Sequence, residues 1–269
     1  MNPIGFNPFS RRIDKGGEKR PEAKTKAEIR PTIVQIFFPD RNRTLSYYND
    51  RFDLRVGDIV FVDGKLEGLR GRVTAVSTYF KVKVEDYKRV ISVADTHVVG
   101  QFFQAGAHLI TFDPLVLPWK QFCSWVKLPQ EDETEYYISY DEEGFPLDNL
   151  SGLDVSGAVI ERGLDYYREN RVRYLCLDGV QGRAIVEGTK PYEVEFRYKD
   201  GQISNLFCDC PCGYTCKHEV AVLFQLRETL EIIDKDYAAQ WGSYFAIVSK
   251  PIFYTFAVDA NPKAVLSLS

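Results

Sequence analysis

Four of the six cysteines fall within nine residues, and one of the three histidines follows two positions later. The five candidate metal donors are Cys208, Cys210, Cys212, Cys216 and His218. Thiolates together with an imidazole form the soft ligand set of tetrahedral structural zinc sites. A redox pair is a poor fit, because no two of these cysteines are separated by two residues. We therefore predict that one zinc ion binds here and that one of the five donors is spare.

Two strands and a helix are expected to position these donors. Apolar and polar residues alternate over 192–198, which is typical of a half-buried strand, and 199–202 predicts a tight turn into a second strand. Period-two alternation places Cys208 and Cys210 on the same side at the end of that strand. The next helix is expected to begin at Cys216, where its positive end favours the thiolate form of that cysteine.

The pattern Cys208-x-Cys210 followed by Cys216-x-His218 resembles the SWIM zinc finger. The resemblance covers residues 155–235, where further matching motifs are Arg162-Gly163-Leu164-Asp165-Tyr166-Tyr167, Val186-Glu187-Gly188, Tyr192-Glu193-Val194 and, from Cys216 onward, CKHEVAVL. It implies that Cys208, Cys210, Cys216 and His218 bind the zinc ion and that Cys212 is a spare thiol. In the alternative, Cys212 replaces His218 and the site consists of four thiolates.

The resemblance also implies a function linked to DNA. Proteins similar to SWIM domains accompany Swi/Snf-type helicase-like ATPases, Mutator-type transposases and recombination factors. A DNA-linked accessory or adaptor with a helicase-like ATPase as partner is therefore implied. Residues 154–235 contain 11 basic and 14 acidic residues, which argues against simple phosphate binding by this region. A local basic patch stays open, with the candidates Arg168, Arg171, Arg173 and Arg183.

No catalytic motif accompanies the cysteines. The sequence lacks a GxxxxGK[ST] phosphate loop, a GxSxG nucleophile elbow, an HExxH zinc motif and a GxGxxG dinucleotide motif. Three cysteines and one histidine close a tetrahedral zinc site, which leaves no position for water or substrate. We therefore predict that the protein is not an enzyme. Two hypotheses stay open, namely an accessory that binds DNA or RNA weakly and a protein-interaction scaffold in which zinc only holds the fold.

The N-terminal part of the sequence predicts a small β-rich domain behind a basic tail. Residues 1–30 contain eight basic and four acidic residues with few apolar ones, so we expect a disordered tail. Residues 31–127 predict five short strands that favour a small, partly open β-barrel, followed by an apolar extension. The spacing of residues 54–77 resembles the KOW-type turn of small barrels in ribosome- and transcription-associated proteins. RNA binding through this barrel is therefore an alternative function.

The remaining domain boundaries follow from the distribution of charge. Residues 128–153 contain eight acidic residues and no basic residue, which is typical of a solvated linker. The zinc-binding SWIM domain is then expected at 154–237, with a C-terminal extension at 238–269. The predicted fold class is α+β, with a small β-barrel-like domain before a zinc module that consists of a β-hairpin and a helix.

Composition restricts the class of protein further. The 269 residues are 27% charged and 45% hydrophobic with a net charge of −4, which indicates a globular chain and argues against whole-molecule binding to a polyanion. Six cysteines are too few for a scaffold held by disulfides. The N-terminus does not have the pattern of a signal peptide, and no uninterrupted apolar stretch is long enough to span a bilayer. We therefore predict a cytoplasmic protein that does not contact membranes.

Overall fold

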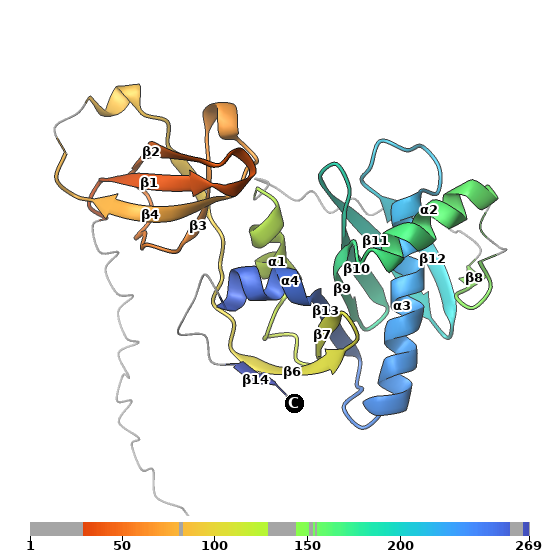
Figure 1. Ribbon diagram of the computed structural model, residues 1–269. Helices are drawn as coiled ribbons and strands as arrows, with labels where there is room; N and C mark the ends of the chain where they lie inside the picture. The colour runs from red at the N-terminus through yellow and green to blue at the C-terminus, as the bar shows by residue number, and fades with distance from the viewer. Residues whose placement is uncertain are drawn as a thin grey trace, which may run out of the picture.

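The computed structural model describes residues 29–80, 83–128, 144–150, 153, 155–258 and 266–268. It has a mixed α/β architecture that consists mostly of two sheets, of five and nine strands, with few helices (Figure 1). The predicted combination of strands and helices is confirmed at this coarse level. Nearly all of the basic tail and most of the acidic linker lie outside the described residues, so both stay predictions.

The smaller sheet is formed near the N-terminus by β1 (Thr32–Phe38), β2 (Arg43–Asn49), β3 (Ile59–Val62), β4 (Gly71–Ser77) and β5 (Val90–Val93). Its strand order is β2-β1-β4-β3-β5. Alternate residues of β1 point inward, and Val34, Ile36 and Phe38 are fully buried. In the described part of this region, a single isolated bridge between Tyr48 and Arg89 joins the two edge strands. The sheet is therefore not a closed barrel, and the predicted barrel-like shape is not confirmed.

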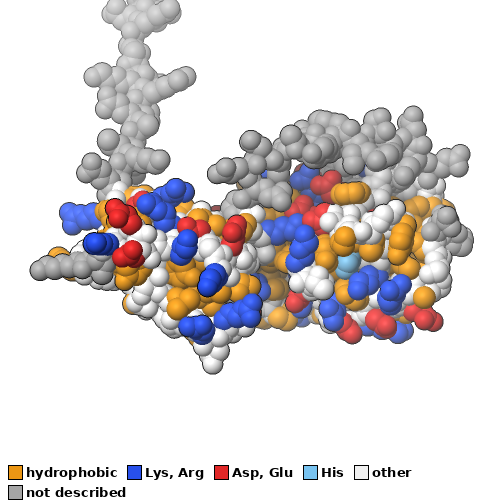
Figure 2. Space-filling view, turned by 90° about the horizontal axis from the view of Figure 1, so that it is seen from above, with side chains coloured by type: hydrophobic (Ala, Val, Ile, Leu, Met, Phe, Trp, Pro, Cys, Tyr) orange, Lys and Arg blue, Asp and Glu red, His pale blue; other side chains and the backbone are white. Residues whose placement is uncertain are grey.

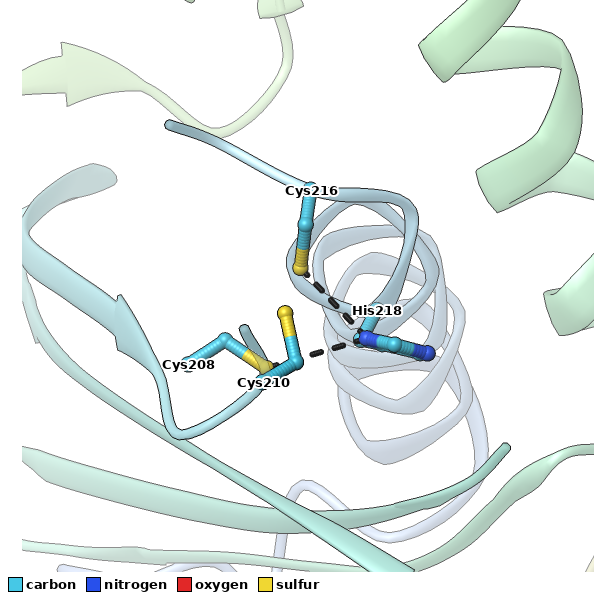
Figure 3. Close-up of side chains that lie close together, drawn as sticks. All are labelled: Cys208, Cys210, Cys216 and His218. Carbon is cyan, nitrogen blue, oxygen red and sulfur yellow. Dashed lines mark hydrogen bonds between the residues drawn. The ribbon is translucent and has the colours of Figure 1, made fainter. Parts of the chain in front are cut away.

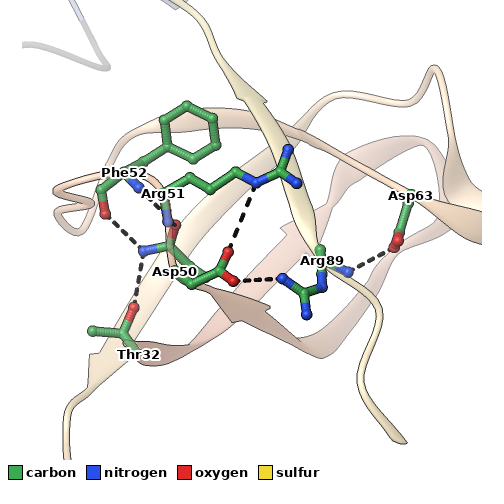
Figure 4. A network of polar contacts seen from close by, with 7 residues as sticks. Thr32, Asp50, Arg51, Phe52, Asp63 and Arg89 are labelled. Carbon is green, nitrogen blue, oxygen red and sulfur yellow. Dashed lines mark hydrogen bonds and ion pairs between the residues drawn. The ribbon is translucent and has the colours of Figure 1, made fainter. Parts of the chain in front are cut away.

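A polar network connects the two edges of the smaller sheet where they meet (Figure 4). The guanidinium group of Arg89 forms an ion pair with Asp50 and lies 5.2 Å from the centroid of the Tyr48 ring. Asn49 is almost fully buried and donates a hydrogen bond to the carbonyl oxygen of Phe52 at 2.7 Å. The contacts of Arg89 hold the end of β2 against the start of β5, where a continuous hydrogen-bond ladder is missing from the described residues, and the Asn49 bond fixes the turn after β2.

The larger sheet takes its strands from widely separated parts of the chain. They are β6 (Gly100–Ala105), β7 (His108–Thr111), β8 (Phe145–Pro146), β9 (Val172–Asp178), β10 (Gln181–Glu187), β11 (Pro191–Lys199), β12 (Gln202–Cys208), β13 (Tyr244–Ser249) and β14 (Leu266–Leu268). Their order is β14-β6-β7-β13-β9-β10-β11-β12-β8. Neighbouring strands are antiparallel, except that β14 and β6 are parallel.

The place of β13 in this sheet differs from the layout expected from the sequence. β13 lies between β7 and β9, with Ile247 opposite Ile110 on one side and Leu175 on the other. The sequence-based layout assigned β6 and β7 to the domain at 31–127 and β13 to the extension at 238–269. All six residues of β13 are buried, so this strand lacks the period-two pattern that would identify a half-buried strand. The domain boundaries themselves stay a prediction.

Helices cover both faces of the larger sheet (Figure 1). Leu175 and Leu177 of β9 belong to a core shared with α2 (Gly157–Arg168) and α3 (Lys217–Asp236). Tyr174 and Cys176 point to the other face, whose core includes α1 (Trp119–Val126) and α4 (Lys250–Phe253). No helix in the described ranges is long and apolar enough to cross a membrane.

Candidate metal centre

The predicted hairpin is present and brings the first two donors to the edge of the larger sheet. β11 and β12 pair antiparallel, and Val194 lies opposite Cys208, the last residue of β12. The turn residues Asp200 and Gly201 have φ angles of 51° and 79°, in the left-handed region that suits such tight hairpin turns. Cys210 follows β12 in the loop and is buried, as Cys208 is. The two thiols therefore lie together as predicted, but the strand ends at Cys208, so Cys210 reaches the cluster from the loop and not from the end of the strand as the alternation predicted.

Helix α3 begins at the third donor, which confirms the predicted start. Cys216 is the N-cap residue, and His218 lies in the first turn. The sulfur of Cys216 accepts a hydrogen bond from the backbone N–H of Glu219, and the Glu219 carboxylate accepts one from the N–H of Cys216. This is a capping box in which cysteine takes the usual place of serine or threonine. The sulfur is thereby held at the positive end of the helix.

The structure brings together the four side chains that the SWIM resemblance implies, namely Cys208, Cys210, Cys216 and His218 (Figure 3). Their donor atoms all lie within 4.8 Å of one another, and all four residues are buried. The Nδ1 atom of His218 lies 3.5 Å from the sulfur of Cys216 and 3.8 Å from that of Cys208. With Zn–S of about 2.3 Å and Zn–N of about 2.0–2.1 Å, tetrahedral geometry separates sulfur from nitrogen by about 3.6 Å. The observed separations therefore suit a zinc tetrahedron.

Cys212 lies outside this cluster. Its side chain is exposed, whereas the three clustered cysteines are buried. Cys212 contacts the cluster through its backbone, because its N–H donates a hydrogen bond to the sulfur of Cys210. In the same way, the backbone N–H of Cys210 donates to the sulfur of Cys208. The geometry thus favours the ligand set with His218 over the set of four thiolates. That each of the four side chains binds zinc stays a prediction.

The three clustered thiols do not ionise alike. A hydrogen bond from the Cys208 thiol lowers the pKa of Cys216 to about 3, with contributions from His218 and the Glu219 N–H, and outweighs the opposing effect of burial. The same interaction and burial raise the pKa of Cys208 far above its ordinary value, while burial raises that of Cys210 to about 11. Cys216 therefore loses its proton easily, and its negative charge opposes the ionisation of Cys208 and Cys210. A bound cation is what lets all three thiols ionise together.

Packing sets the orientation of the imidazole ring. Tyr192 stacks on His218 with ring centroids 4.5 Å apart, and Tyr166 meets the same ring edge-on at 5.4 Å. A Cβ atom at Gly188 would lie 2.7 Å from the Tyr192 ring and 3.1 Å from Nε2 of His218, so a larger residue would displace both. Within the described part of the chain, Nε2 is buried and has no hydrogen-bond partner. Aromatic contacts therefore direct Nδ1 toward the sulfurs.

A group of three charged residues beside the cluster, Lys127, Glu193 and Asp209, forms ion pairs that the sequence did not predict. Lys127 Nζ lies 2.5 Å from Glu193 Oε1 and 3.0 Å from Asp209 Oδ2. Burial acts to lower the pKa of Lys127, but the hydrogen bonds and charges of the two carboxylates outweigh burial and raise the pKa. Because 82 positions separate Lys127 from Asp209, no local pattern in the sequence predicts this contact.

The arginines considered for a basic patch are largely neutralised. Figure 2 shows Lys and Arg side chains mixed with Asp and Glu on the visible face, rather than gathered in one area. Three of the four candidates form ion pairs, namely Arg171 with Glu169, Arg173 with Glu187 and Arg183 with Glu195. Such pairs reduce the positive potential that these side chains offer to a phosphate. The ion pairs argue against a basic patch built on these arginines.

These features define a zinc-binding α/β protein whose metal centre joins a hairpin to a helix. The model of the SWIM zinc finger family matches residues 193–227, so the chain contains a SWIM zinc finger. The match spans the hairpin, the four clustered side chains and the first half of α3, and is shorter than the resemblance over 155–235. No curated protein and no solved structure matches the chain. The cluster of three cysteines and one histidine fits one structural zinc ion.

Proposed function

We propose that this protein is a non-catalytic, DNA-linked accessory or adaptor in which zinc has a structural role. The supporting observation is that four donors from the chain itself are buried and lie within 4.8 Å of one another. Four protein ligands complete a tetrahedral zinc site, so no position is left at which water or a substrate is activated. The role of the metal is then to join the loop after β12 to the start of α3.

A helicase-like ATPase is the proposed protein partner, and DNA or RNA is the proposed weak ligand. The partner follows from the SWIM finger at 193–227, because proteins with such fingers accompany these ATPases. We assign nucleic-acid binding to residues 1–30 and the five-stranded sheet, because the tail has eight basic residues against four acidic ones. The ion pairs of Arg171, Arg173 and Arg183, which precede the finger in the sequence, support this assignment, because these arginines offer little free positive charge.

Salt dependence of nucleic-acid binding tests this assignment. Fluorescence anisotropy with labelled DNA and RNA should show an affinity that falls with salt by about 0.9 log units per log unit for each phosphate contact. Removal of residues 1–28 should flatten that slope, whereas replacing Lys190 and Lys217, which lie near the zinc site, with Met should leave it nearly unchanged. A slope that depends on Lys190 and Lys217 and not on the tail would contradict the assignment. A strong preference for RNA would favour the alternative of an RNA-binding accessory.

A protein-interaction scaffold is the second candidate, favoured by the pairing of Arg171, Arg173 and Arg183 with acids. In that case the full chain binds neither DNA nor RNA at low salt, and zinc only maintains the surface that the partner contacts.

Affinity capture with the zinc-loaded chain, followed by mass spectrometry, should enrich a helicase-like ATPase under the proposed function. The His218→Ala variant serves as the matched control, because loss of zinc should abolish that enrichment.

A further inference from the structure

Asp209 lies between two of the clustered cysteines and is held by residues outside their loop. Its N–H donates to the carbonyl oxygen of Glu193 at 3.0 Å, and its Oδ1 accepts a hydrogen bond from the N–H of Glu193 at 2.8 Å. Its second carboxylate oxygen accepts a hydrogen bond from Lys127 Nζ at 3.0 Å. Three polar groups of one residue therefore determine where the segment from Cys208 to Cys210 lies.

Lys127 is well suited to hold this carboxylate because its own position is determined by the core. It is the C-cap residue of α1, and its N–H donates to the carbonyl oxygen of Cys123 at 2.9 Å. Phe122 and Trp125 of the same helix are fully buried in the aromatic core on that face of the sheet. The Lys127 side chain is 21% exposed, so its ammonium group is less hydrated than that of a surface lysine. The Lys127 ammonium group is thus partly buried at the end of a helix whose position is fixed by packing.

The charges around Lys127 make its position critical for the loop. Glu193 and Asp209 both direct carboxylate oxygens at Nζ, at 2.5 and 3.0 Å. Without the ammonium group, two carboxylates would face each other with no cation between them, and their repulsion acts on the loop. Asp209 is adjacent to both Cys208 and Cys210, so its displacement moves these sulfurs away from Cys216 and His218.

We propose that Lys127 is a positioning residue of the zinc site, which acts through Asp209 to keep the Cys208–Cys210 segment closed and so slows zinc release. Groups that orient metal ligands from outside the coordination sphere typically change metal affinity about 10- to 100-fold when they are removed. The zinc finger is then supported by the end of α1, although Lys127 precedes Glu193 by 66 residues and Asp209 by 82 in the sequence.

Zinc release from the full-length, zinc-loaded protein tests this proposal. The rate of transfer to an excess of a chromogenic chelator, measured well below the melting temperature, should rise about tenfold in Lys127→Met. Lys127→Arg retains the cation and should release zinc at close to the rate of the unaltered protein. Lys199→Met is the matched control, because Lys199 is exposed at the other end of β11. It should leave the rate unchanged.

A double-mutant cycle separates positioning from general packing. Asp209→Asn alone should speed zinc release while α1 keeps its packing, and in that background Lys127→Met should add much less than it does alone. The same variant also keeps the proposal testable if Lys127→Met does not fold. A lower melting temperature in Lys127→Met with an unchanged release rate would overturn the proposal, because Lys127 would then serve packing only. Additive effects of the two substitutions would overturn the action through Asp209.

Discussion

The five-stranded sheet and the zinc finger hold their chain segments by different means. The sheet encloses a continuous apolar core, to which its five strands contribute Val34, Tyr47, Val60, Val73 and Val90 in turn. In the finger, only Cys210 is buried among residues 209–215. A segment this polar cannot be fixed by apolar burial, so a metal ion and a few charged contacts must fix it. The comparison indicates that metal binding and charged contacts fix this loop, whereas the hairpin before it and the helix after it pack into the apolar core of the larger sheet.

Removal of zinc should have the largest effect and should be confined to the finger. Elemental analysis should give one zinc per chain, and replacing any of Cys208, Cys210, Cys216 or His218 with Ala should release it. Metal binding stabilises isolated zinc-finger peptides by about 10–16 kcal/mol, so most of the order near the metal should be lost. Hydrogen exchange should rise around residues 200–235 and stay unchanged in β1 to β5.

The spare thiol provides the control for this prediction. Cys212→Ser should keep the zinc ion, because the Cys212 side chain is exposed and its contribution to the loop is a backbone N–H. If Cys212→Ser lost zinc while His218→Ala retained it, the all-thiolate ligand set would be correct. Accelerated exchange in the five-stranded sheet after chelation would contradict the contrast between the two regions.

Truncation of a core residue should destabilise the five-stranded sheet and leave zinc binding unchanged. Phe38 is fully buried and its ring centroid lies 5.8 Å from that of Tyr47. Phe38→Ala should lower the free energy of unfolding of the smaller sheet by about 3–5 kcal/mol, because it removes buried area and leaves a cavity. The change should be measured by hydrogen exchange in urea, with zinc content unaltered. Val56→Ala is the control, since Val56 is 67% exposed and its loss should have little effect.

The same contrast explains what could be predicted from the sequence. The hairpin, the start of α3 and the clustered donors follow from neighbouring residues, such as the alternation over 192–198 and the spacing from Cys208 to His218. The place of β13 does not, because all its residues are buried and its partners β7 and β9 are distant in the sequence. Lys127 was missed for a related reason, since only the packing of α1 brings it to Asp209.

A smaller effect is expected where α2 and α3 approach each other beside the metal centre. A Cβ atom at Gly163 would lie 2.4 Å from a methyl group of Val220, which the packed helices cannot accommodate without moving apart. Gly163→Ala should therefore destabilise this region by about 1–3 kcal/mol. Thermal unfolding monitored together with zinc release should detect the change. Gly157→Ala, in the same helix with open space around it, should be neutral or slightly stabilising. Equal effects of both substitutions would mean that the close approach is unimportant.

The smallest effect is expected at the edge of the five-stranded sheet. Arg89 joins its two edges through an ion pair with Asp50 and a contact with the Tyr48 ring, but its side chain is 44% exposed. Exposed pairs and cation–π contacts contribute about 1 kcal/mol or less, so Arg89→Met should cost no more than that. Urea denaturation at low and high salt should show that the loss shrinks as salt increases.

The effect of Arg89→Met on stability should not depend on whether zinc is bound. Arg55→Met should be silent, because both partners of the Arg55–Asp53 pair are more than 80% exposed. The cost of Arg89→Met should be the same in the zinc-loaded and the chelated protein, because the contacts of Arg89 with described residues are made to Asp50, Tyr48 and Asp63 and not to the finger. A cost that changed with zinc would mean that the two regions are energetically coupled. The apolar core of the sheet would then depend on the metal centre, and the division between burial and metal binding would fail.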